Sequence, residues 1–244
     1  MSSYNLDTSV LTEACKKIGI TLTDKQTEQF LTYYEYLVEK NKVMNLTAIT
    51  EYEEVVLKHF VDSLSIVKAV NMGDYHKLLD LGTGAGFPGI PLKIAFPDVE
   101  VVLMDSLNKR IKFLNEVIEK LELEHITAVH ARAEEGARKT EHREQFDICV
   151  SRAVANLSSL AEYCLPFVKK SGIFISYKSM KIDDEIKTAD KAVSILGGKI
   201  DRVEEFMLPD TEIGRSFVII KKIKPTPGKY PRKAGLPTKE PLGN

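Results

Sequence analysis

The sequence predicts an α/β fold: a doubly wound, mostly parallel, seven-stranded sheet with a helical N-terminal extension. Two observations favour it. From about residue 77, short apolar runs alternate with helical segments, and the first of these runs ends on Asp80, before Gly82, Gly84 and Gly86. A buried parallel strand leads into a tight turn in this way. We expect the extension over residues 1–75, the sheet domain over 76–223 and a tail over 224–244.

The first 75 residues have the apolar spacing of helices. In the first helix the apolar positions on one face are Val10, Leu11, Ala14, Cys15 and Ile18. Thr23 with Gln26 forms a capping-box pattern that predicts the start of a second helix. Thr50 with Glu53 repeats this pattern and predicts the start of a third.

The period changes after residue 76. Strands are expected at 77–82, 100–105, 126–130, 146–151, 172–178, near 200–208 and at 216–223, with helices at 108–121, 157–168 and 181–196. Alternation of this kind predicts parallel strands with helices on both faces. Because only a loop separates the last two strands, we expect them to pair antiparallel at one edge.

The charge of the chain is balanced overall but uneven. Its 244 residues carry a net charge of −1, which argues against a basic nucleic-acid binder as a whole. The tail, however, is basic, and it holds five of the ten prolines. Such a segment is predicted to be an extended basic arm rather than a helix or a central strand. The alternative is a tail that only adds solubility.

Cysteine usage and hydropathy indicate a cytosolic protein. The three cysteines have unrelated spacings, so neither a disulfide framework nor a zinc site is expected, and Cys149 and Cys164 are predicted to pack in the core. No apolar run reaches about 18 residues, the length that would predict a membrane span. The N-terminus lacks the pattern of a secretion signal.

The glycine loop has two interpretations. Residues 84–89 match the GxGxxG pattern of dinucleotide sites, but Pro88 has no N–H to offer a pyrophosphate. The alternate glycines after Asp80 are instead typical of S-adenosylmethionine-dependent methyltransferases. That cofactor needs close backbone approach, a carboxylate near its ammonium and an acid for its ribose. We therefore interpret the loop as a site for S-adenosylmethionine, against a nicotinamide-dependent oxidoreductase or a glycine turn with no ligand.

Two carboxylates accompany this loop. Asp80 can accept hydrogen bonds from the amides of the turn or from a ligand ammonium. Asp105 closes the next apolar run, near the separation of about 20 residues at which nucleoside-binding α/β folds place the acid that holds a ribose.

Seven segments in family order give a narrower indication. They cover residues 45–49, 59–64, 79–89, 105–110, 132–134, 151–155 and 229–233, and include Gly-Phe-Pro-Gly, Arg-Ala-Val-Ala and Tyr-Pro-Arg-Lys. These segments resemble the bacterial RsmG family, also called glucose-inhibited division protein B. The resemblance implies a class I, Rossmann-like methyltransferase that modifies N7 of a guanosine in 16S ribosomal RNA.

The resemblance also implies cofactor contacts at Gly82, Phe87, Ala133, Glu134 and Arg152. Ala133 and Glu134 follow the third expected strand, where a loop can reach an adenine edge; the alternative for Glu134 is a solvated charge. Arg152 ends the fourth strand, at the edge where open α/β sheets bind ligands. It can pair with the cofactor carboxylate or an RNA phosphate, and the alternative is a structural salt bridge.

The implied reaction requires little acid–base chemistry. Guanine N7 carries an in-plane lone pair and no proton, so no general base is needed and we name no catalytic residue. Catalysis is then mostly positioning, which can contribute about 7–11 kcal/mol.

Candidate contacts to RNA lie in several segments. Lys229, Arg232 and Lys233 are candidates for phosphates, and Tyr230 for stacking on a base. Three further candidates are Lys178, which ends the fifth strand, and Asn45 and His59 in the family-like N-terminal segments. His59 and Asp62 are three apart on one predicted helix, so they can share a face and hydrogen-bond; the alternative is that they only brace the extension.

The expected partners are S-adenosylmethionine and the small ribosomal subunit, with no metal and no membrane, and the expected state is a monomer. Two rival functions keep much of this picture. One is a non-catalytic RNA-binding assembly factor with a relic pocket, and the other is a methyltransferase for a different acceptor.

Overall fold

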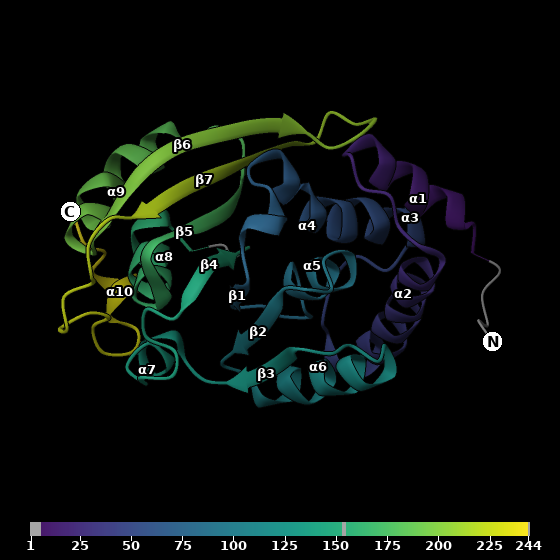
Figure 1. Ribbon diagram of the computed structural model, residues 1–244, viewed down its shortest axis with the longest axis horizontal. Helices are drawn as coiled ribbons and strands as arrows, with labels where there is room; N and C mark the ends of the chain where they lie inside the picture. The colour runs from purple at the N-terminus through teal and green to yellow at the C-terminus, as the bar shows by residue number, and fades with distance from the viewer. Residues whose placement is uncertain (1–5, 153–154, 244) are drawn as a thin grey trace.

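A seven-stranded sheet forms the centre of the computed structural model, which describes residues 6–152 and 155–243 (Figure 1). The strand order is β3-β2-β1-β4-β5-β7-β6. The strands are β1 (Lys77–Leu81), β2 (Glu100–Asp105), β3 (Ile126–His130), β4 (Phe146–Ser151), β5 (Val168–Ser179), β6 (Gly198–Met207) and β7 (Gly214–Lys222). The predicted fold class and the predicted order of the strands along the chain are confirmed.

Pairing along the sheet places the carboxyl ends of the central strands at one edge. Strands β3, β2, β1, β4 and β5 pair in parallel, so that Leu79 lies beside Val102 on one side and Cys149 on the other. The strands β7 and β6 pair antiparallel, as predicted, and β7 inserts between β5 and β6. Ligands in open α/β sheets bind outside the edge where these carboxyl ends meet.

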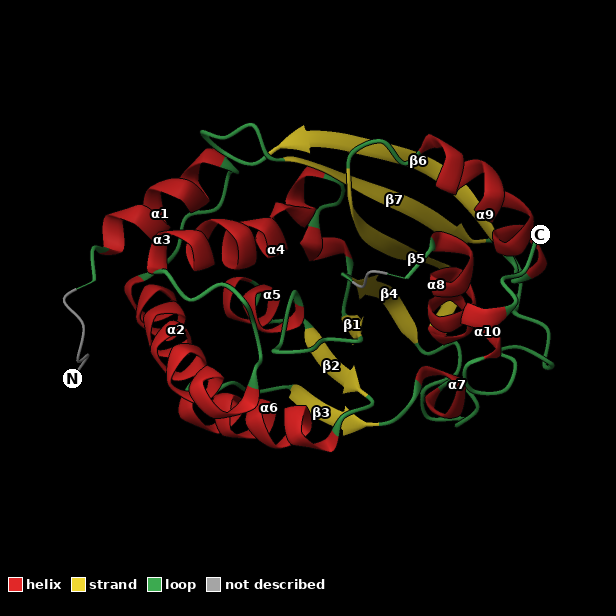
Figure 2. Cartoon of the chain, turned by 180° about the vertical axis from the view of Figure 1, so that it is seen from behind, coloured by secondary structure: helices red, strands yellow, loops and turns green. Residues whose placement is uncertain are grey.

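Alternation along the strands divides the interior into two cores. The core on one face of the sheet includes residues of α1 (Thr8–Lys17), α2 (Asp24–Met44), α5 (Gly89–Ala95) and α6 (Asn108–Lys120). The other face packs against α8 (Leu157–Cys164), α9 (Asp183–Ile195) and Tyr230 of the C-terminal segment. Figure 2 shows the helices that cover the two sides. Because Leu78 and Leu79 point to opposite faces, β1 contributes to both cores.

Two predicted helix boundaries have different outcomes. The capping box at Thr23 and Gln26 is confirmed at the start of α2. The one at Thr50 and Glu53 is wrong, because α3 (Tyr52–Val55) begins after Glu51 without a side-chain cap. The helix expected over 157–168 ends at Cys164, and a 3₁₀ turn (Leu165–Phe167) leads directly into β5.

The remaining N-terminal elements form a continuous run of helical turns. This run comprises α3, a π-helix (Val56–Val61), α4 (Asp62–Leu64) and a 3₁₀ turn (Ser65–Lys68), and a second 3₁₀ turn (Met72–Asp74) precedes β1. π-helical turns inside helices frequently occur at functional sites. This one packs through Val56, Phe60 and Val61 onto the same core as the sheet.

The expectation of an extended C-terminal arm is wrong. Residues 224–243 fold back onto the second core and contain a short helix, α10 (Leu236–Lys239). Pro237 lies in the first turn of α10, where a missing N–H costs no helical hydrogen bond. Figure 1 shows this segment beside α7 (Ala133–Gly136) and α8, at the end of the molecule opposite the N-terminus.

The cysteines are confirmed as core residues, since Cys149 and Cys164 are buried in the second core. Among the described residues, no helix combines the length and apolar character that a membrane crossing requires.

Candidate functional site

The loop after β1 is organised by the Asp80 side chain. Its Oδ2 accepts hydrogen bonds from Thr83 Oγ1 at 2.6 Å and from the Gly89 amide at 2.7 Å. Asp80 is fully buried, its Oδ1 has no hydrogen-bond partner among the described residues, and burial raises its pKa to about 7. Of the two alternatives for Asp80, the structure therefore shows hydrogen bonding within the turn, which closes the loop onto α5.

The three glycines of the loop have different roles. Gly82 and Gly84 have positive φ angles, and a Cβ on either would meet no protein atom within 4 Å, so both leave open space above the loop. At Gly86 a Cβ would lie 2.5 Å from Ile90 Cδ1 and 2.8 Å from the Tyr33 hydroxyl. The first two glycines therefore make room for a ligand, whereas Gly86 permits packing against α2 and α5.

Asp105 joins this loop to the end of β2. Its Oδ2 accepts from the Gly84 amide at 3.0 Å and from Arg110 Nη1 at 3.1 Å, and its Oδ1 accepts from the Leu107 amide at 2.9 Å. The residue is buried but lines the cavity described next.

A cavity of about 280 Å³ lies at the carboxyl ends of β1, β2 and β4. Among the predicted residues, Gly82, Asp105, Ala133 and Glu134 line it. The lining residues that were not predicted are Leu81, Met104, Ser106, Ala131, Arg132, Ser151, Ala155, Leu160, Tyr163 and Gly235. Ser106 was detectable as the neighbour of Asp105. No sequence signal places Gly235 there, because it comes from the C-terminal segment.

Glu134 lies in the first turn of α7, at the wall of this cavity. Its side chain is buried, and Oε1 accepts a hydrogen bond from the Gly235 amide at 3.0 Å. The alternative that Glu134 is a solvated charge is therefore wrong. No group in the described part of the chain donates a hydrogen bond to Oε2, which leaves that oxygen available to a ligand in the cavity.

Arg152 does not line this cavity. It donates to Asp62 Oδ2 at 3.0 Å and to the Lys58 carbonyl at 3.2 Å, and Arg215 donates to Asp62 Oδ1 at 2.9 Å. The structural salt bridge considered for Arg152 is thus present. In the family-like segment that begins at Ser151, residues Ala153 and Val154 lie outside the described residues.

Phe87 and His59 pack beneath Arg152. Their rings stack with centroids 4.5 Å apart, and the Arg152 guanidinium lies 5.1 Å from the Phe87 centroid. Phe87 is buried and does not line the cavity. Burial and the charge of Arg152 lower the pKa of His59 to about 4, so its ring is neutral at pH 7.

His59 and Asp62 do not form the hydrogen bond that their spacing allows. His59 Nε2 instead lies 2.8 Å from Thr47 Oγ1, and the Asp62 carboxylate is paired with Arg152 and Arg215. Arg152 lies between the two residues, since its guanidinium contacts Asp62 and also lies 3.4 Å from His59 Nδ1.

Two of the RNA candidates in the tail are engaged inside the protein. Tyr230 is buried in the second core, and the Arg232 guanidinium makes a two-pronged contact with Glu162 at 2.7 and 3.0 Å. Neither side chain is free for a base or a phosphate, which corrects the expectation for both. Lys229 and Lys233 remain exposed.

The other RNA candidates have separate positions. Lys178 donates to the Ala155 carbonyl at 2.8 Å and to Glu185 at 2.6 Å, so its charge is compensated. Asn45 is exposed, in the left-handed conformation that ends α2.

The residues at the cavity suit a nucleoside-bearing ligand. Leu81, Met104 and Leu160 offer apolar walls, Asp105 and Glu134 offer carboxylate oxygens, and the glycines leave the approach open. Pockets of this kind, mostly apolar with a few placed polar groups, are typical of cofactor sites. Within the described part of the chain, no group of His, Cys, Asp or Glu is arranged to hold a metal ion.

Comparisons with known proteins identify the family. The model of the GidB family, described as rRNA small subunit methyltransferase G, matches residues 26–213. A ribosomal RNA small subunit methyltransferase G of Lachnoclostridium phytofermentans is 58% identical over 236 residues, which cover 97% of this chain and 98% of that protein. One of Desulforamulus reducens is 54% identical, covering 96% and 98%.

Solved structures show the same fold at low identity. A putative O-methyltransferase from Klebsiella pneumoniae has a TM-score of 0.53 and 11% identity, and the match covers 79% of this chain and 90% of that one. At this identity the likeness concerns the fold alone.

Proposed function

The chain belongs to the rRNA small subunit methyltransferase G family, and from that premise we propose that it transfers a methyl group from S-adenosylmethionine to N7 of a guanosine in 16S ribosomal RNA. The observation that carries this proposal is the cavity at the carboxyl ends of β1 and β2, with Gly82, Asp105 and Glu134 on its walls. We further propose that the protein acts as a cytosolic monomer.

Binding of the cofactor is assigned to the residues that line the cavity. Asp105 and Glu134 would hold the polar groups of the nucleoside, while Met104 and Leu160 would pack against its base. Asp80 contributes by closing the loop through Thr83 and Gly89, and Gly84 by anchoring the loop on Asp105. When bound, S-adenosylmethionine supplies an electrophilic methyl group.

The protein's contribution to the reaction is positioning. Guanine N7 has no proton to lose, so the reaction needs no general base. Neither His59 nor Asp80 lines the cavity, and Asp80 is enclosed by its own loop. Alignment of the two reactants alone can contribute about 7–11 kcal/mol.

Contacts to RNA are assigned to the exposed candidates. Lys229 and Lys233 are exposed on the C-terminal segment, whose Gly235 lines the cavity, and Asn45 lies at the exposed end of α2. Phosphate contacts by lysine would position the RNA without reading its sequence.

The decisive experiment maps 7-methylguanosine in 16S ribosomal RNA from cells with and without this gene. The modification should disappear in the absence of the gene and return with the wild-type chain, but not with Gly84→Asp, which places a bulky anion over the loop. Persistence of the modification in cells that lack the gene would contradict the assigned acceptor.

Two binding measurements separate the rivals. Calorimetry with S-adenosylhomocysteine should show binding, whereas fluorescence titration with reduced nicotinamide cofactor should show none. An RNA-binding factor with a relic pocket would bind small subunits but transfer no radiolabelled methyl group to them.

A further inference from the structure

The C-terminal segment, residues 224–243, forms part of the wall of the cofactor cavity. Gly235 lines the cavity, and its amide donates to Glu134 Oε1 at 3.0 Å. Glu134 lies 101 positions earlier in the chain, so this contact exists only if the segment is held in place.

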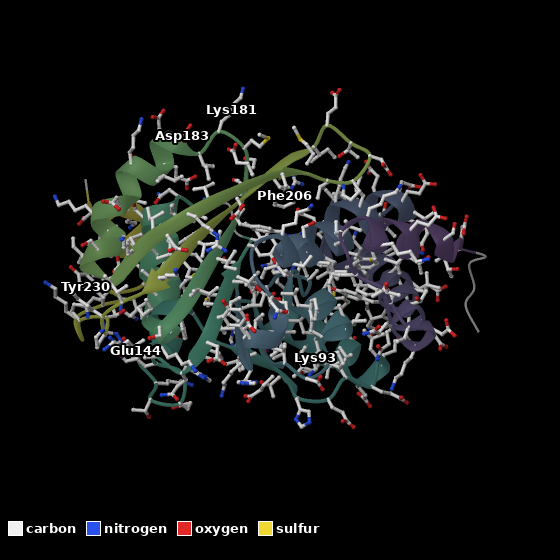
Figure 3. All side chains as sticks on the ribbon, turned by 45° about the horizontal axis from the view of Figure 1, so that its top comes forward. Lys93, Glu144, Lys181, Asp183, Phe206 and Tyr230 are labelled. Atoms are coloured by element: carbon white, nitrogen blue, oxygen red, sulfur yellow. The ribbon has the colours of Figure 1, made fainter. Side chains whose placement is uncertain are left out.

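The base of the segment is anchored by three charged side chains. Lys222 Nζ contacts Thr226 Oγ1 at 2.7 Å and Glu144 Oε1 at 3.0 Å, with the lysine fully buried. Arg143 donates to the carbonyls of Thr226 at 2.9 Å and Tyr230 at 3.0 Å. Figure 3 shows Glu144 and Tyr230 at the same end of the molecule. These contacts fix the segment as far as Tyr230.

The next anchor is the pair formed by Arg232 and Glu162. Glu162 is completely buried on α8, and its Oε1 accepts from the Arg232 amide at 2.7 Å while Oε2 accepts from Nη2 at 2.7 Å. Arg232 Nη2 also reaches the Glu240 carbonyl at 2.7 Å, which closes the segment on itself. Gly235 follows only three residues after this anchor.

The helix that holds Arg232 also shapes the cavity. Leu160 and Tyr163, on either side of Glu162 in sequence, line the cavity, and Tyr163 Oη lies 2.8 Å from Thr238 Oγ1. A bidentate arginine–carboxylate pair is both strong and geometrically specific. The pair therefore sets how close the segment approaches α7 and Glu134.

We infer that Arg232 is a positioning residue for the cofactor site: its pair with Glu162 holds the Gly235 amide on Glu134 and so orients the Glu134 carboxylate toward the bound nucleoside. This inference rests on the proposed function, since the ligand of the cavity is taken to be S-adenosylmethionine. It assigns a cofactor-site role to a residue that the sequence suggested for RNA.

The first test compares Arg232→Gln with Lys239→Gln in the full chain. Both variants remove one positive charge from the same segment, but only Arg232 is paired with a buried acid. Calorimetry with S-adenosylhomocysteine should give a dissociation constant about tenfold or more higher for Arg232→Gln, the scale of one lost charge-assisted hydrogen bond, and an unchanged one for Lys239→Gln. Arg232→Lys should fall between them, since it keeps the charge without the fork.

Equal affinity of Arg232→Gln and wild type, within twofold, would overturn the inference while leaving the proposed function intact. Failure of the wild-type chain to bind S-adenosylhomocysteine would instead overturn the proposed function itself.

A second measurement uses only the wild-type chain and does not depend on the folding of a variant. Hydrogen–deuterium exchange should slow in peptides covering residues 232–240 when S-adenosylhomocysteine is added, because ligand on Glu134 tightens the Gly235 contact. Unchanged exchange in these peptides, with protection elsewhere around the cavity, would contradict the positioning role.

Discussion

The Asp62 carboxylate accepts a hydrogen bond from the Arg152 guanidinium at 3.0 Å, and this ion pair ties the N-terminal helices to the end of β4. The second oxygen of Asp62 accepts a hydrogen bond from Arg215 of β7 at 2.9 Å. One buried acid therefore joins three parts of the chain, and the N-terminal helices share their core with the sheet. Breaking such a pair leaves charges that lack a partner in a poorly solvated place.

Replacing this acid should destabilise the protein. We expect Asp62→Asn to lower the free energy of unfolding by about 2–3 kcal/mol, below the 3–5 kcal/mol of a fully buried pair because both arginines keep some exposure. Arg215→Gln should cost less, because Asp62 keeps Arg152. Urea denaturation measures both, and equal stability of Asp62→Asn and wild type would contradict this account.

The two kinds of glycine in the loop predict different defects. Gly82→Ala should weaken binding of S-adenosylhomocysteine, because the new methyl group enters open space at the cavity rather than protein. Gly86→Ala should mainly lower the melting temperature, because its methyl group would collide with Ile90 and Tyr33. The positive φ angle adds about 1–2 kcal/mol of strain in both. Calorimetry and thermal unfolding of the two variants form a matched comparison, and identical profiles would refute the distinction.

Burial of Asp80 predicts a pH dependence of stability. Its pKa is about 7 in the folded chain, above the ordinary value of 3.8, so the folded state holds a proton that the unfolded state releases. Stability from this group is complete below pH 3.8 and is lost as the pH rises toward 7. Relative to wild type, Asp80→Asn should therefore gain stability with rising pH, by up to about 1.4 kcal/mol per pH unit in this window. Chemical denaturation at several pH values measures the difference, which should level off above pH 7.

The lowered pKa of His59 predicts that stability is lost as the pH falls, the opposite of the trend for Asp80. Its pKa of about 4 lies below the ordinary 6.5, so the folded chain resists protonation of the ring. Its contribution to stability is present above pH 6.5 and is lost as the pH falls toward 4. Relative to wild type, His59→Gln should gain stability over that interval. A difference that does not change between pH 6.5 and 4 would show that the ring is not held neutral.

The exposed lysines predict a salt-dependent effect on RNA binding. Lys229→Ala and Lys233→Ala should each reduce the slope of log affinity against log salt by about 1 and leave binding of S-adenosylhomocysteine unchanged. Lys25→Ala, an exposed lysine at the start of α2, is the matched control and should leave the slope unchanged. Filter binding to small subunits measures the slopes. Slopes equal to that of wild type would remove both lysines from the RNA contact.

The strands of the sheet were predicted well from local sequence. The expected strands at 100–105, 126–130 and 146–151 coincide with β2, β3 and β4. In β2 and β4 the apolar run reflects burial on both faces of a parallel strand, whereas β3 is a partly exposed edge strand. The loop after β1 was equally readable, since Asp80 and its glycines lie within a few residues of the groups they contact.

The roles of Arg152 and Arg232 could not be predicted from local sequence. Both carry a charge at the edge where ligands bind, and sequence alone does not distinguish a free charge from a paired one. Their partners lie far along the chain: Asp62 is 90 positions from Arg152, and Glu162 is 70 from Arg232.

The sequence by itself determined the order of the strands along the chain, the glycine loop with its two acids, and the family. Only the tertiary structure decided which charges are neutralised inside and that Gly235 reaches Glu134 across 101 residues. The physical reason is that periodicity and turn chemistry act between near neighbours in the chain, whereas ion pairs and cavity walls form between segments that only folding brings together.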